Sequence, residues 1–383
     1  MNEVKLASIE RCLACSSQDL CQIIDLGSQP LANDFLIQPT IQETYPLKLN
    51  FCETCSHLQL SHSVDRKKLF DEYLYVSGTT QTLRADFKDF AEFIDSRFPK
   101  GRIIDIACND GSQLDEFKKL GWKTMGIDPA SNLFKFSSAN HLIIQDYLRT
   151  GLQSFVKADL TIAQNVLAHT DNPKDFVHTA SEIAPTNFYQ TSQANMVANG
   201  EFDTIYHEHI SFFSERSFFE LSRMANTKLV SVEKRKIHGT SFLFETGAGL
   251  EIDPPEPIKK EDVLAFSDKA ISTISHLRQI ILEEKSSGRL VIGYGAAAKG
   301  MTVLNAVNVK IDFIVDDSPL KIGRFSPGLH IPIIGIDKVQ EFHQPLTVIL
   351  TAWNFEREIR ARMAKVYSGP IKYLKYFPNI DIS

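Results

Sequence analysis

Short apolar runs alternate with helical segments from residue 101 to residue 191, and this alternation constrains the fold more than any other feature of the chain. Each run is only four or five residues long, which suits a buried strand better than a helix. Strands that alternate with helices favour a parallel sheet covered by helices on both faces. The predicted strands are 103–107, 123–127, 141–144, 159–163 and 187–191, with helices over 112–120 and 173–183 among them.

A second alternating region follows a proline-containing linker at 251–256. A long helix is predicted from about residue 260 to 285, and a glycine-rich turn at 293–300 separates a strand from a helix. The predicted strands of this region are 289–293, 311–315 and 347–351. The pattern therefore indicates a second, smaller parallel α/β domain.

Four of the six cysteines form two Cys-x-x-Cys pairs, Cys12 with Cys15 and Cys52 with Cys55. Two thiolates at this spacing reach one tetrahedral ion, and two such pairs complete the shell of a zinc ion. Because four sulfurs leave no open coordination position, this zinc would be structural and not catalytic. The alternative is four free thiols. The intervening segment 25–36 is read as a turn-rich loop with an apolar end.

The first glycine-containing turn, Asp105–Gly111, follows the first strand of the first α/β region. Acidic groups at Asp105 and Asp110 would repel a pyrophosphate, whereas they suit a cationic nucleoside such as S-adenosylmethionine. Asp128 ends the next strand, where a carboxylate accepts ribose hydroxyls, and Asp146 lies where a carboxylate meets an adenine amino group. The alternative is a tight turn without a ligand. The residues assigned to this cofactor are Asp105, Ala107, Asn109, Gly111, Asp128, Asp146 and Asn165.

The second turn has the pattern G-x-G-x-x-A, which matches the dinucleotide fingerprint. Its backbone N–H groups and the helix N-terminus favour phosphate, and Lys299 adds a cation. NAD and a nucleoside diphosphate are both compatible ligands, and a turn that only packs helix against strand is the alternative. The residues assigned to the substrate are His238, Gly293, Tyr294, Gly295, Lys299 and Asp316.

The stretch Thr204–His209 places a phenol, two imidazoles and a carboxylate within six residues. This is a high density of groups that hold or move a proton near neutral pH. A neutral imidazole is a suitable general base near neutral pH, and Tyr206 or His169 is suited to donate a hydrogen bond to a developing oxyanion. A surface loop rich in histidine, or a metal site, is the alternative.

Composition excludes several other classes of function. A formal net charge of −6 gives no indication of a nucleic-acid-binding face. No apolar run approaches the roughly 20 residues of a membrane span, and the N-terminus lacks the apolar core of a signal peptide. We therefore expect a cytoplasmic, soluble protein that is a monomer or a weak homo-oligomer.

Taken in order, these motifs resemble the sugar-nucleotide C-methyltransferases that build branched-chain deoxysugars. The resemblance covers nearly the whole chain, from the Cys-x-x-Cys pairs through Tyr75–Gly78 and residues 201–209 to the turn at 293–300. It implies an N-terminal zinc-binding domain (1–68), a central Rossmann-like class I S-adenosylmethionine-dependent methyltransferase domain (69–252) and a C-terminal Rossmann-like domain that binds the nucleotide sugar (257–383).

The implied reaction is methylation at C3 of a dTDP-linked 4-keto-6-deoxysugar. The resemblance makes His209 the general base and places Tyr206, Glu208, His169 and Tyr75 around it. Thr240, Leu243 and Met301 depart from the residues expected at their positions, which bears on the identity of the sugar or nucleotide. The competing interpretations are a nicotinamide-dependent oxidoreductase of a nucleotide sugar, an O- or N-methyltransferase, and a binding protein that keeps the fold without activity.

Overall fold

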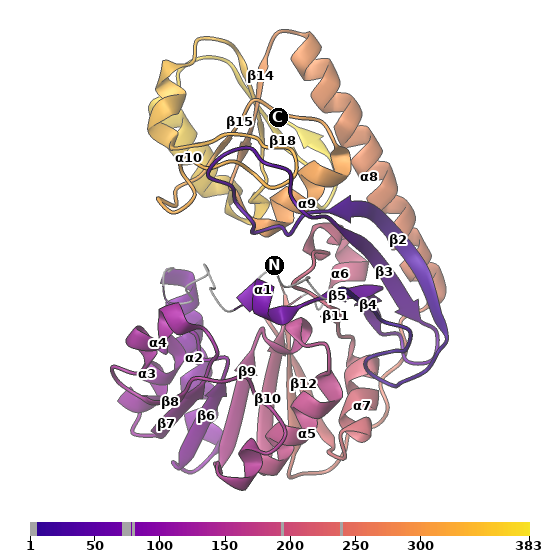
Figure 1. The fold of residues 1–383 in the computed structure, drawn as a ribbon, viewed down its shortest axis with the longest axis vertical. Helices are drawn as coiled ribbons and strands as arrows, with labels where there is room; N and C mark the ends of the chain where they lie inside the picture. The colour runs from indigo at the N-terminus through magenta and orange to yellow at the C-terminus, as the bar shows by residue number, and fades with distance from the viewer. Residues whose placement is uncertain (1–5, 71–77, 79–80, 193–194, 238–239) are drawn as a thin grey trace. The chain divides into compact units, whose positions relative to one another are not determined.

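The computed structural model describes residues 6–70, 78, 81–192, 195–237 and 240–383. The chain forms two compact units, each built from separate stretches of sequence (Figure 1). Unit 1 comprises Met1–Cys21, Phe51–Ala194 and Glu208–Lys259, and unit 2 comprises Gln22–Asn50, Asn195–His207 and Lys260–Ser383. The boundaries of these two compact units differ from those of the three domains predicted from the sequence, 1–68, 69–252 and 257–383. The three domains describe functions and stay a prediction.

The centre of unit 1 is a mixed sheet. Among the described residues its strands follow the order β12-β13-β10-β9-β6-β7-β8. Neighbouring strands from β10 to β8 run parallel, and β13 is antiparallel to both β10 and β12. This is the order of the class I methyltransferase fold, with a late antiparallel strand inserted next to the edge. The strands are β6 (Arg102–Ile106), β7 (Lys123–Ile127), β8 (Leu142–Ile144), β9 (Leu160–Gln164), β10 (Thr186–Thr191), β12 (Leu229–Arg235) and β13 (Ser241–Gly247).

Helices cover both faces of this sheet. The helices of unit 1 are α1 (Arg66–Phe70), α2 (Gln81–Arg97), α3 (Ser112–Lys119), α4 (Ser131–Ser137), α5 (Pro173–Ile183) and α7 (Glu215–Met224), with short 3-10 turns η2 (Leu152–Ser154) and η3 (Leu167–His169). Apolar residues of α2 and α3 pack with Ile103, Ile162 and Phe188 on one face. Those of α5 and α7 pack with Ile104 and Tyr189 on the other. Both faces are thus buried, as the continuous apolar runs of the sequence predict.

Short strands complete unit 1 next to the cysteine pairs. β1 (Leu6–Ser8) pairs antiparallel with β5 (His62–Val64), and β4 (Leu58–Leu60) pairs antiparallel with β11 (Ser211–Phe212). The buried cysteines Cys12, Cys52 and Cys55 belong to the same apolar cluster as the aromatic residues of α7. The segments that carry the two cysteine pairs therefore share one apolar core with the central sheet of unit 1.

Unit 2 contains a second parallel sheet. Its described strands follow the order β16-β15-β14-β17-β18-β19, and only β19 runs antiparallel to its neighbour. The strands are β14 (Leu290–Tyr294), β15 (Phe313–Val315), β16 (Ile333–Ile334), β17 (Leu346–Ile349), β18 (Ile371–Lys375) and β19 (Asp381–Ile382). The accompanying helices are α6 (Met196–Asn199), α8 (Lys260–Ser286), α9 (Ala298–Val307) and α10 (Glu356–Val366), with 3-10 turns η4 (Phe202–Thr204), η5 (Ile336–Glu341) and η6 (Trp353–Phe355). The predicted second α/β region is present, with more strands than the sequence indicated.

Unit 2 also includes a segment from near the N-terminus. The long strands β2 (Leu20–Gln29) and β3 (Tyr45–Cys52) pair with each other, and all of β2 beyond Cys21 lies in this unit. The next residues reach the C-terminal half of the chain, because the N–H and C=O of Leu36 bond to the backbone of Phe325. The prediction of a loop over 25–36 is therefore wrong for its first five residues, which continue β2 despite a left-handed Gly27.

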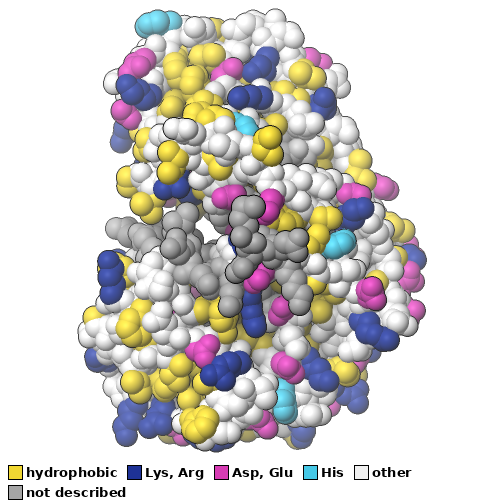
Figure 2. All heavy atoms as spheres, in the orientation of Figure 1, with side chains coloured by type: hydrophobic (Ala, Val, Ile, Leu, Met, Phe, Trp, Pro, Cys, Tyr) yellow, Lys and Arg dark blue, Asp and Glu magenta, His cyan; other side chains and the backbone are white. Residues whose placement is uncertain are grey.

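The charge on the surface and the hydropathy of the helices can be compared with what the composition predicts. Lys and Arg side chains are interspersed with Asp and Glu on the face that Figure 2 shows. Of the helices in the described part of the chain, none is both long enough and apolar enough to cross a membrane.

Candidate functional site

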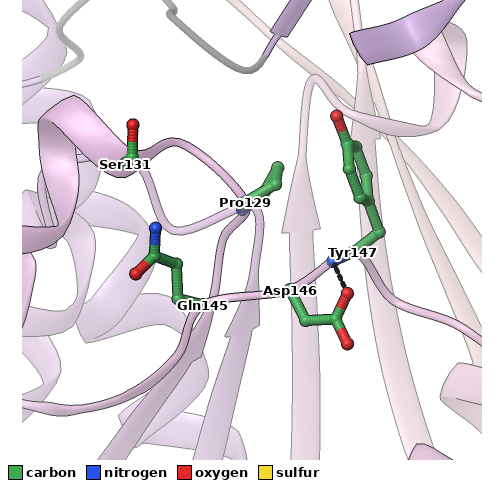
Figure 3. Close-up of a pocket in the computed structure, with 5 residues that line it drawn as sticks. All are labelled: Pro129, Ser131, Gln145, Asp146 and Tyr147. Atoms are coloured by element: carbon green, nitrogen blue, oxygen red, sulfur yellow. Dashed lines mark hydrogen bonds between the residues drawn. The ribbon is translucent and has the colours of Figure 1, made fainter.

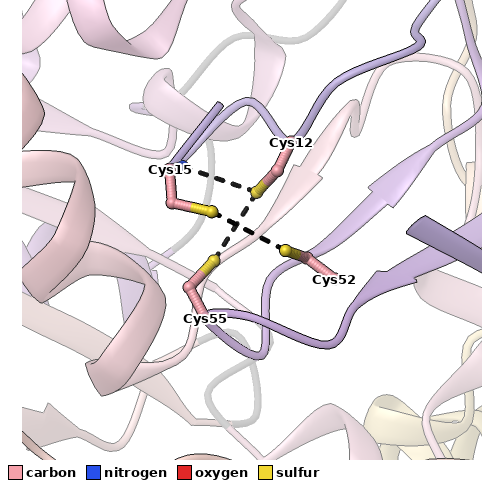
Figure 4. A group of neighbouring side chains, drawn as sticks. All are labelled: Cys12, Cys15, Cys52 and Cys55. Atoms are coloured by element: carbon pink, nitrogen blue, oxygen red, sulfur yellow. Dashed lines mark hydrogen bonds between the residues drawn. The ribbon is translucent and has the colours of Figure 1, made fainter. Parts of the chain in front are cut away.

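The four paired cysteines converge on one point of unit 1 (Figure 4). Their sulfur atoms all lie within 4.8 Å of one another, with 3.5 Å between Cys12 and Cys55 and 3.7 Å between Cys15 and Cys52. A tetrahedral shell with Zn–S bonds of about 2.3 Å places its sulfurs about 3.8 Å apart. The observed spacing fits that shell and is too long for disulfides, whose sulfurs are about 2.05 Å apart.

The two cysteine pairs also share one backbone geometry. The N–H of Ser16 bonds to the carbonyl of Cys12, and the N–H of Ser56 bonds to the carbonyl of Cys52. Both serines adopt a left-handed conformation, with φ of 65° and 60°. Each pair is thus a tight knuckle that aims two thiols at the same side, so the donor set and the backbone both fit a zinc ion.

The turn after β6 lies where the strand order of the unit 1 sheet reverses, between β6 and β9. Ligands of open α/β sheets bind at this position, beyond the carboxyl ends of the strands. The turn is tightly wound, since Ala107, Asn109 and Gly111 all have φ between 51° and 83°. Left-handed backbone is unfavourable for alanine, so the turn holds a strained residue at Ala107.

The carboxylates around this turn differ in their environment. Asp128 accepts the N–H groups of Asn109 and Ala130, and burial raises its pKa. Asp110 accepts the N–H groups of Gly78 and Ser112. Both carboxylates therefore hold the backbone of the turn in place, and each keeps lone pairs for a further donor.

A pocket of about 240 Å³ opens beyond β7 and β8, the neighbouring strands of the same sheet edge (Figure 3). It is lined by Pro129, Ser131, Gln145, Asp146 and Tyr147. Complete ligand pockets measure roughly 300–1,000 Å³, so this one suits a part of a ligand such as a nucleobase. Asp146, predicted to meet an adenine amino group, lines it, and its carboxylate accepts the N–H of Tyr147 and the Nε–H of Arg149.

Polar atoms without partners gather at the carboxyl ends of β6, β9 and β10. Oδ1 of Asp105, Nε2 of Gln164 and Oε1 of Gln190 are buried and have no hydrogen-bond partner among the described residues. All three residues lie on the sheet face that α2 covers, because each follows an apolar residue of that face (Ile103, Ile162 or Phe188) by two positions. Gln164 pairs directly with Gln190. Burial and the neighbouring Asp128 and Asp110 raise the pKa of Asp105 well above its ordinary value.

Such buried polar atoms normally find a partner in protein, water or ligand. Two acceptors and one donor fit an ammonium group and a carboxylate, which are the groups at the amino-acid end of S-adenosylmethionine. The residues at this sheet edge therefore fit that cofactor. Sequence reasoning missed Gln164 and Gln190, although their position at the ends of two predicted neighbouring strands was a usable signal.

His209 and His169 lie together in unit 1. Their rings meet edge to face with centroids 5.1 Å apart. The backbone after His209 is held on both sides, since the N–H of Ile210 bonds to Ala168 and its carbonyl accepts the N–H of Leu60. Desolvation lowers the pKa of His169 to about 4, so its ring is neutral at neutral pH. The prediction that these two histidines belong to one site is consistent with this geometry.

The other histidine of the stretch has a different environment. His207 is 3% exposed, its Nε2 lies 3.2 Å from the carbonyl oxygen of Tyr45, and burial lowers its pKa to about 4. It therefore anchors the stretch to β3. Glu208 is buried and Tyr206 is half-buried. Tyr75 and His238, which the sequence assigned to the site, lie outside the described residues.

The glycine-rich turn of unit 2 lies between β14 and α9, at the point where the strand order of that sheet reverses. Gly295 has φ of 100°, and a Cβ there would lie 2.5 Å from the Cβ of Ala352. The hydroxyl of Thr351 donates to the carbonyl oxygens of Tyr294 and Gly295. The turn is thus fixed against the end of β17, which accounts for its glycine without requiring a ligand.

The residues predicted to bind the substrate around this turn differ in their surroundings. Gly293 lies within β14, and Tyr294 is buried in the apolar core of the unit. Asp316 accepts the N–H groups of Ala296 and Ser318, one at each carboxylate oxygen. Lys299 is half-buried, with its ammonium 5.1 Å from the ring of Trp353. Asp316 thus holds the backbone of this turn in the same way as Asp128 holds the turn after β6.

The chain matches three protein families in succession. Residues 12–70 match a zinc binding domain, residues 78–232 match a methyltransferase domain, and residues 258–378 match the C-methyltransferase C-terminal domain. The zinc-binding match contains both cysteine knuckles. The methyltransferase match contains the turn after β6 and the stretch with His209.

One curated relative is similar over almost the whole chain. C-methyltransferase NovU of Streptomyces niveus is 26% identical, and the similarity covers 92% of this chain and 91% of NovU. Solved structures match a smaller part. Magnesium protoporphyrin IX methyltransferase of Synechocystis PCC 6803 with bound SAM is 11% identical over 43% of this chain and 78% of its own, with a TM-score of 0.34. The PH0226 protein of Pyrococcus horikoshii OT3 is 12% identical over 48% of this chain and 98% of its own, with a TM-score of 0.36.

Proposed function

Because this chain belongs to the S-adenosylmethionine-dependent C-methyltransferases that carry a zinc-binding domain, we propose that it methylates C3 of a nucleotide-linked 4-keto-6-deoxysugar. A dTDP-linked sugar is the proposed substrate, and the synthesis of branched-chain deoxysugars is the proposed role. The observation that carries the proposal is the pairing of His209 with a neutral His169. Transfer of a methyl group to carbon needs such a base, because the carbon must first lose a proton.

The proposed chemistry begins with proton removal. An imidazole nitrogen of His209 takes the proton from C3, the C3–H electron pair forms the C3–C4 double bond, and the C4 carbonyl oxygen becomes an enolate. A neutral His169 keeps an N–H that donates a hydrogen bond to this oxygen, and Tyr206 has a hydroxyl that can do the same. Glu208 is the proposed partner of a sugar hydroxyl or of the base. S-adenosylmethionine, when bound, would supply an electrophilic methyl group: the C3–CH₃ bond would form as the S–CH₃ bond breaks, with S-adenosylhomocysteine as the leaving group and the C4 ketone restored.

The cofactor would be held in unit 1. The unpartnered oxygens of Asp105 and Gln190 and the amide nitrogen of Gln164 are the proposed contacts to its amino-acid end. Asp128, which retains acceptor capacity, is the proposed ribose contact, and the pocket that Asp146 lines is the proposed site of adenine. Ala107, Asn109, Gly111 and Asn165 complete the proposed cofactor site.

The nucleotide would bind the glycine-rich turn of unit 2. Lys299 follows this turn in the first turn of α9, and a helix N-terminus attracts phosphate. Gly293, Tyr294, Gly295 and Asp316 are proposed to shape the turn around the diphosphate, and His238 is proposed to contact the sugar. Separate sites for the cofactor and the nucleotide account for the two α/β sheets of the chain.

Methylation assays with S-adenosylmethionine and a series of 4-keto-6-deoxyhexoses linked to dTDP, UDP or GDP test the proposal. We expect a new C–CH₃ group at C3 by NMR, with dTDP preferred. With S-adenosylhomocysteine in place of the methyl donor, the C3 hydrogen should exchange for deuterium in D₂O. A methyl group on oxygen or nitrogen, or activity without C3 exchange, would contradict the proposed mechanism.

A further inference from the structure

Asp203 is a buried carboxylate for which the proposed reaction has no direct use. It is 1% exposed and lies in η4 of unit 2. Its Oδ2 accepts the indole N–H of Trp353 at 2.7 Å and the hydroxyl of Tyr376 at 3.1 Å. Its Oδ1 has no partner among the residues that the structure describes. Because burying a carboxylate without full pairing is unfavourable, this residue is a poor choice if stability were its only role.

The two donors to Asp203 come from the C-terminal half of the chain. Trp353 lies in η6, shortly after β17, and its ring packs on that of Phe377 with centroids 4.2 Å apart. Trp353 also contacts Lys299, whose ammonium is 5.1 Å from the centre of the indole ring. One indole thus contacts a cation at the glycine-rich turn and a carboxylate at η4.

Asp203 lies in the sequence shortly before the residues of the proposed catalytic site. It precedes Tyr206 by three residues and His209 by six. The segment with Asp203 packs in unit 2, and the chain enters unit 1 after His207. Hydrogen bonds from Trp353 and Tyr376 therefore fix the start of the segment that carries the proposed base.

We propose that Asp203 is a positioning residue which, through Trp353, couples the glycine-rich turn at Lys299 to the segment that carries His209. The coupling rests on the proposed function, since it assigns a nucleoside diphosphate to that turn. A diphosphate that binds Lys299 competes with the indole for the ammonium group and changes the surroundings of Trp353. Trp353 and Asp203 then set the segment that leads to the base in the geometry needed for proton removal.

Substitutions at the hydrogen bonds test the positioning role. Asp203→Ala removes the acceptor, Trp353→Phe and Tyr376→Phe each remove one donor, and Asp203→Asn keeps an acceptor oxygen. An error of about 1 Å in the position of a catalytic group can cost roughly 100-fold in rate. We therefore expect Asp203→Ala to lower kcat and the C3 deuterium exchange by at least about 10-fold, with KM and S-adenosylhomocysteine affinity within about 3-fold of wild type. Asp203→Asn should have a kcat within about 3-fold of wild type. The control Asp268→Ala, on the exposed side of α8, should also stay within about 3-fold of wild type.

A purely structural role gives a different result. The rate per folded molecule, counted by titration with S-adenosylhomocysteine, would then stay at the wild-type value in Asp203→Ala and Trp353→Phe. That result would overturn the positioning role. If Asp203→Ala does not fold, Tyr376→Phe and Trp353→Phe carry the test, because the first loses only a hydroxyl donor and the second keeps an aromatic ring, although a smaller one, without the N–H donor. A wild-type enzyme that is inactive on every nucleotide sugar would instead overturn the proposed function.

The coupling itself is read by fluorescence. The chain has two tryptophans, so Trp122→Phe leaves Trp353 as the only indole. We expect dTDP to change the emission of Trp353 with a saturating curve, and Lys299→Ala to abolish the change, while thymidine without phosphates has no effect. Calorimetric binding of dTDP without any change in emission would overturn the coupling. Absence of dTDP binding in calorimetry would point to failure of the proposed nucleotide site.

Discussion

The ring of His169 packs edge to face on the ring of His209, with an interplanar angle of 65°. Since desolvation keeps His169 neutral at neutral pH, it adds no positive charge beside the proposed base. A neutral imidazole also retains one N–H donor. The two histidines thus fit the different roles that we propose for them, proton transfer by His209 and hydrogen-bond donation by His169.

Loss of the base should stop the reaction before methyl transfer. We expect His209→Ala to reduce turnover by at least about 10³-fold, because general base catalysis contributes about 10²–10⁴. C3 deuterium exchange should fall with it, while S-adenosylhomocysteine still binds with wild-type affinity by calorimetry. Turnover near the wild-type rate would refute the assignment of the base.

Replacement of the donor should have a smaller effect. His169→Phe keeps an aromatic ring against His209 and removes both ring nitrogens. Removal of one oxyanion donor costs about 10²–10³ in kcat, so a fall of about 100-fold is expected with little change in KM. A variant with normal kcat would show that Tyr206 or another donor suffices. His178→Phe, at a half-buried histidine bonded to the carbonyl of Ala225, is the matched control and should keep full activity.

Zinc removal should affect more than the N-terminal module. Cys12, Cys52 and Cys55 share an apolar cluster with α7, and β4 pairs with β11 directly after His209. We expect about one zinc per chain by elemental analysis. Chelation should lower the Tm by at least about 10 °C, because structural zinc contributes many kcal/mol to folding.

Matched cysteine variants separate the metal from the thiols. Cys52→Ser should lose zinc and activity, whereas Cys21→Ser, outside the cluster, should keep both. Full stability of the metal-free protein would contradict a structural zinc ion.

Much of the fold follows from the sequence because its signals are local. Asn172 caps α5 and Pro173 opens it, and the observed helix has the predicted limits, Pro173–Ile183. The strand Lys123–Ile127 likewise has the predicted limits. Such elements are specified by caps, glycines and apolar periodicity within a few residues.

The remaining features depend on contacts between distant residues. Nothing near Leu36 in the sequence indicates its pairing with Phe325, so the membership of residues 22–50 in unit 2 was not predicted. The sequence shows Gln164 and Gln190 at the ends of predicted strands, but the unpartnered atoms, Nε2 of Gln164 and Oε1 of Gln190, are recognisable only once β9 and β10 are aligned. The same holds for the contact of His207 with the carbonyl of Tyr45, which distinguishes it from His209, whose ring packs on His169, in a stretch where both are plausible bases.

The strained turn after β6 offers a stabilising substitution. Ala107 has φ of 64°, a left-handed conformation that costs alanine about 1–2 kcal/mol and glycine nearly nothing. After the entropy cost of glycine, Ala107→Gly should stabilise the protein by about 0.5–1 kcal/mol in denaturant unfolding. Ala85→Gly in the exposed face of α2 is the control and should destabilise by about 1 kcal/mol. Destabilisation by Ala107→Gly would show that this backbone conformation is not strained.

Buried neutral histidines should make the protein sensitive to mild acid. Burial lowers the pKa of His57 to about 3 and that of His207 to about 4, against about 6.5 in the unfolded chain. Below pH 6.5 the unfolded state therefore binds protons that the folded state does not, so stability is complete above pH 6.5 and falls as the pH decreases toward 4. Each such histidine contributes a loss of about 1.4 kcal/mol per pH unit in this window. His57→Gln, whose amide can still bond the hydroxyl of Ser211, should reduce the slope of unfolding free energy against pH by that amount, whereas the exposed control His276→Gln should leave it unchanged. An equal slope in wild type and His57→Gln would contradict the neutral state of His57.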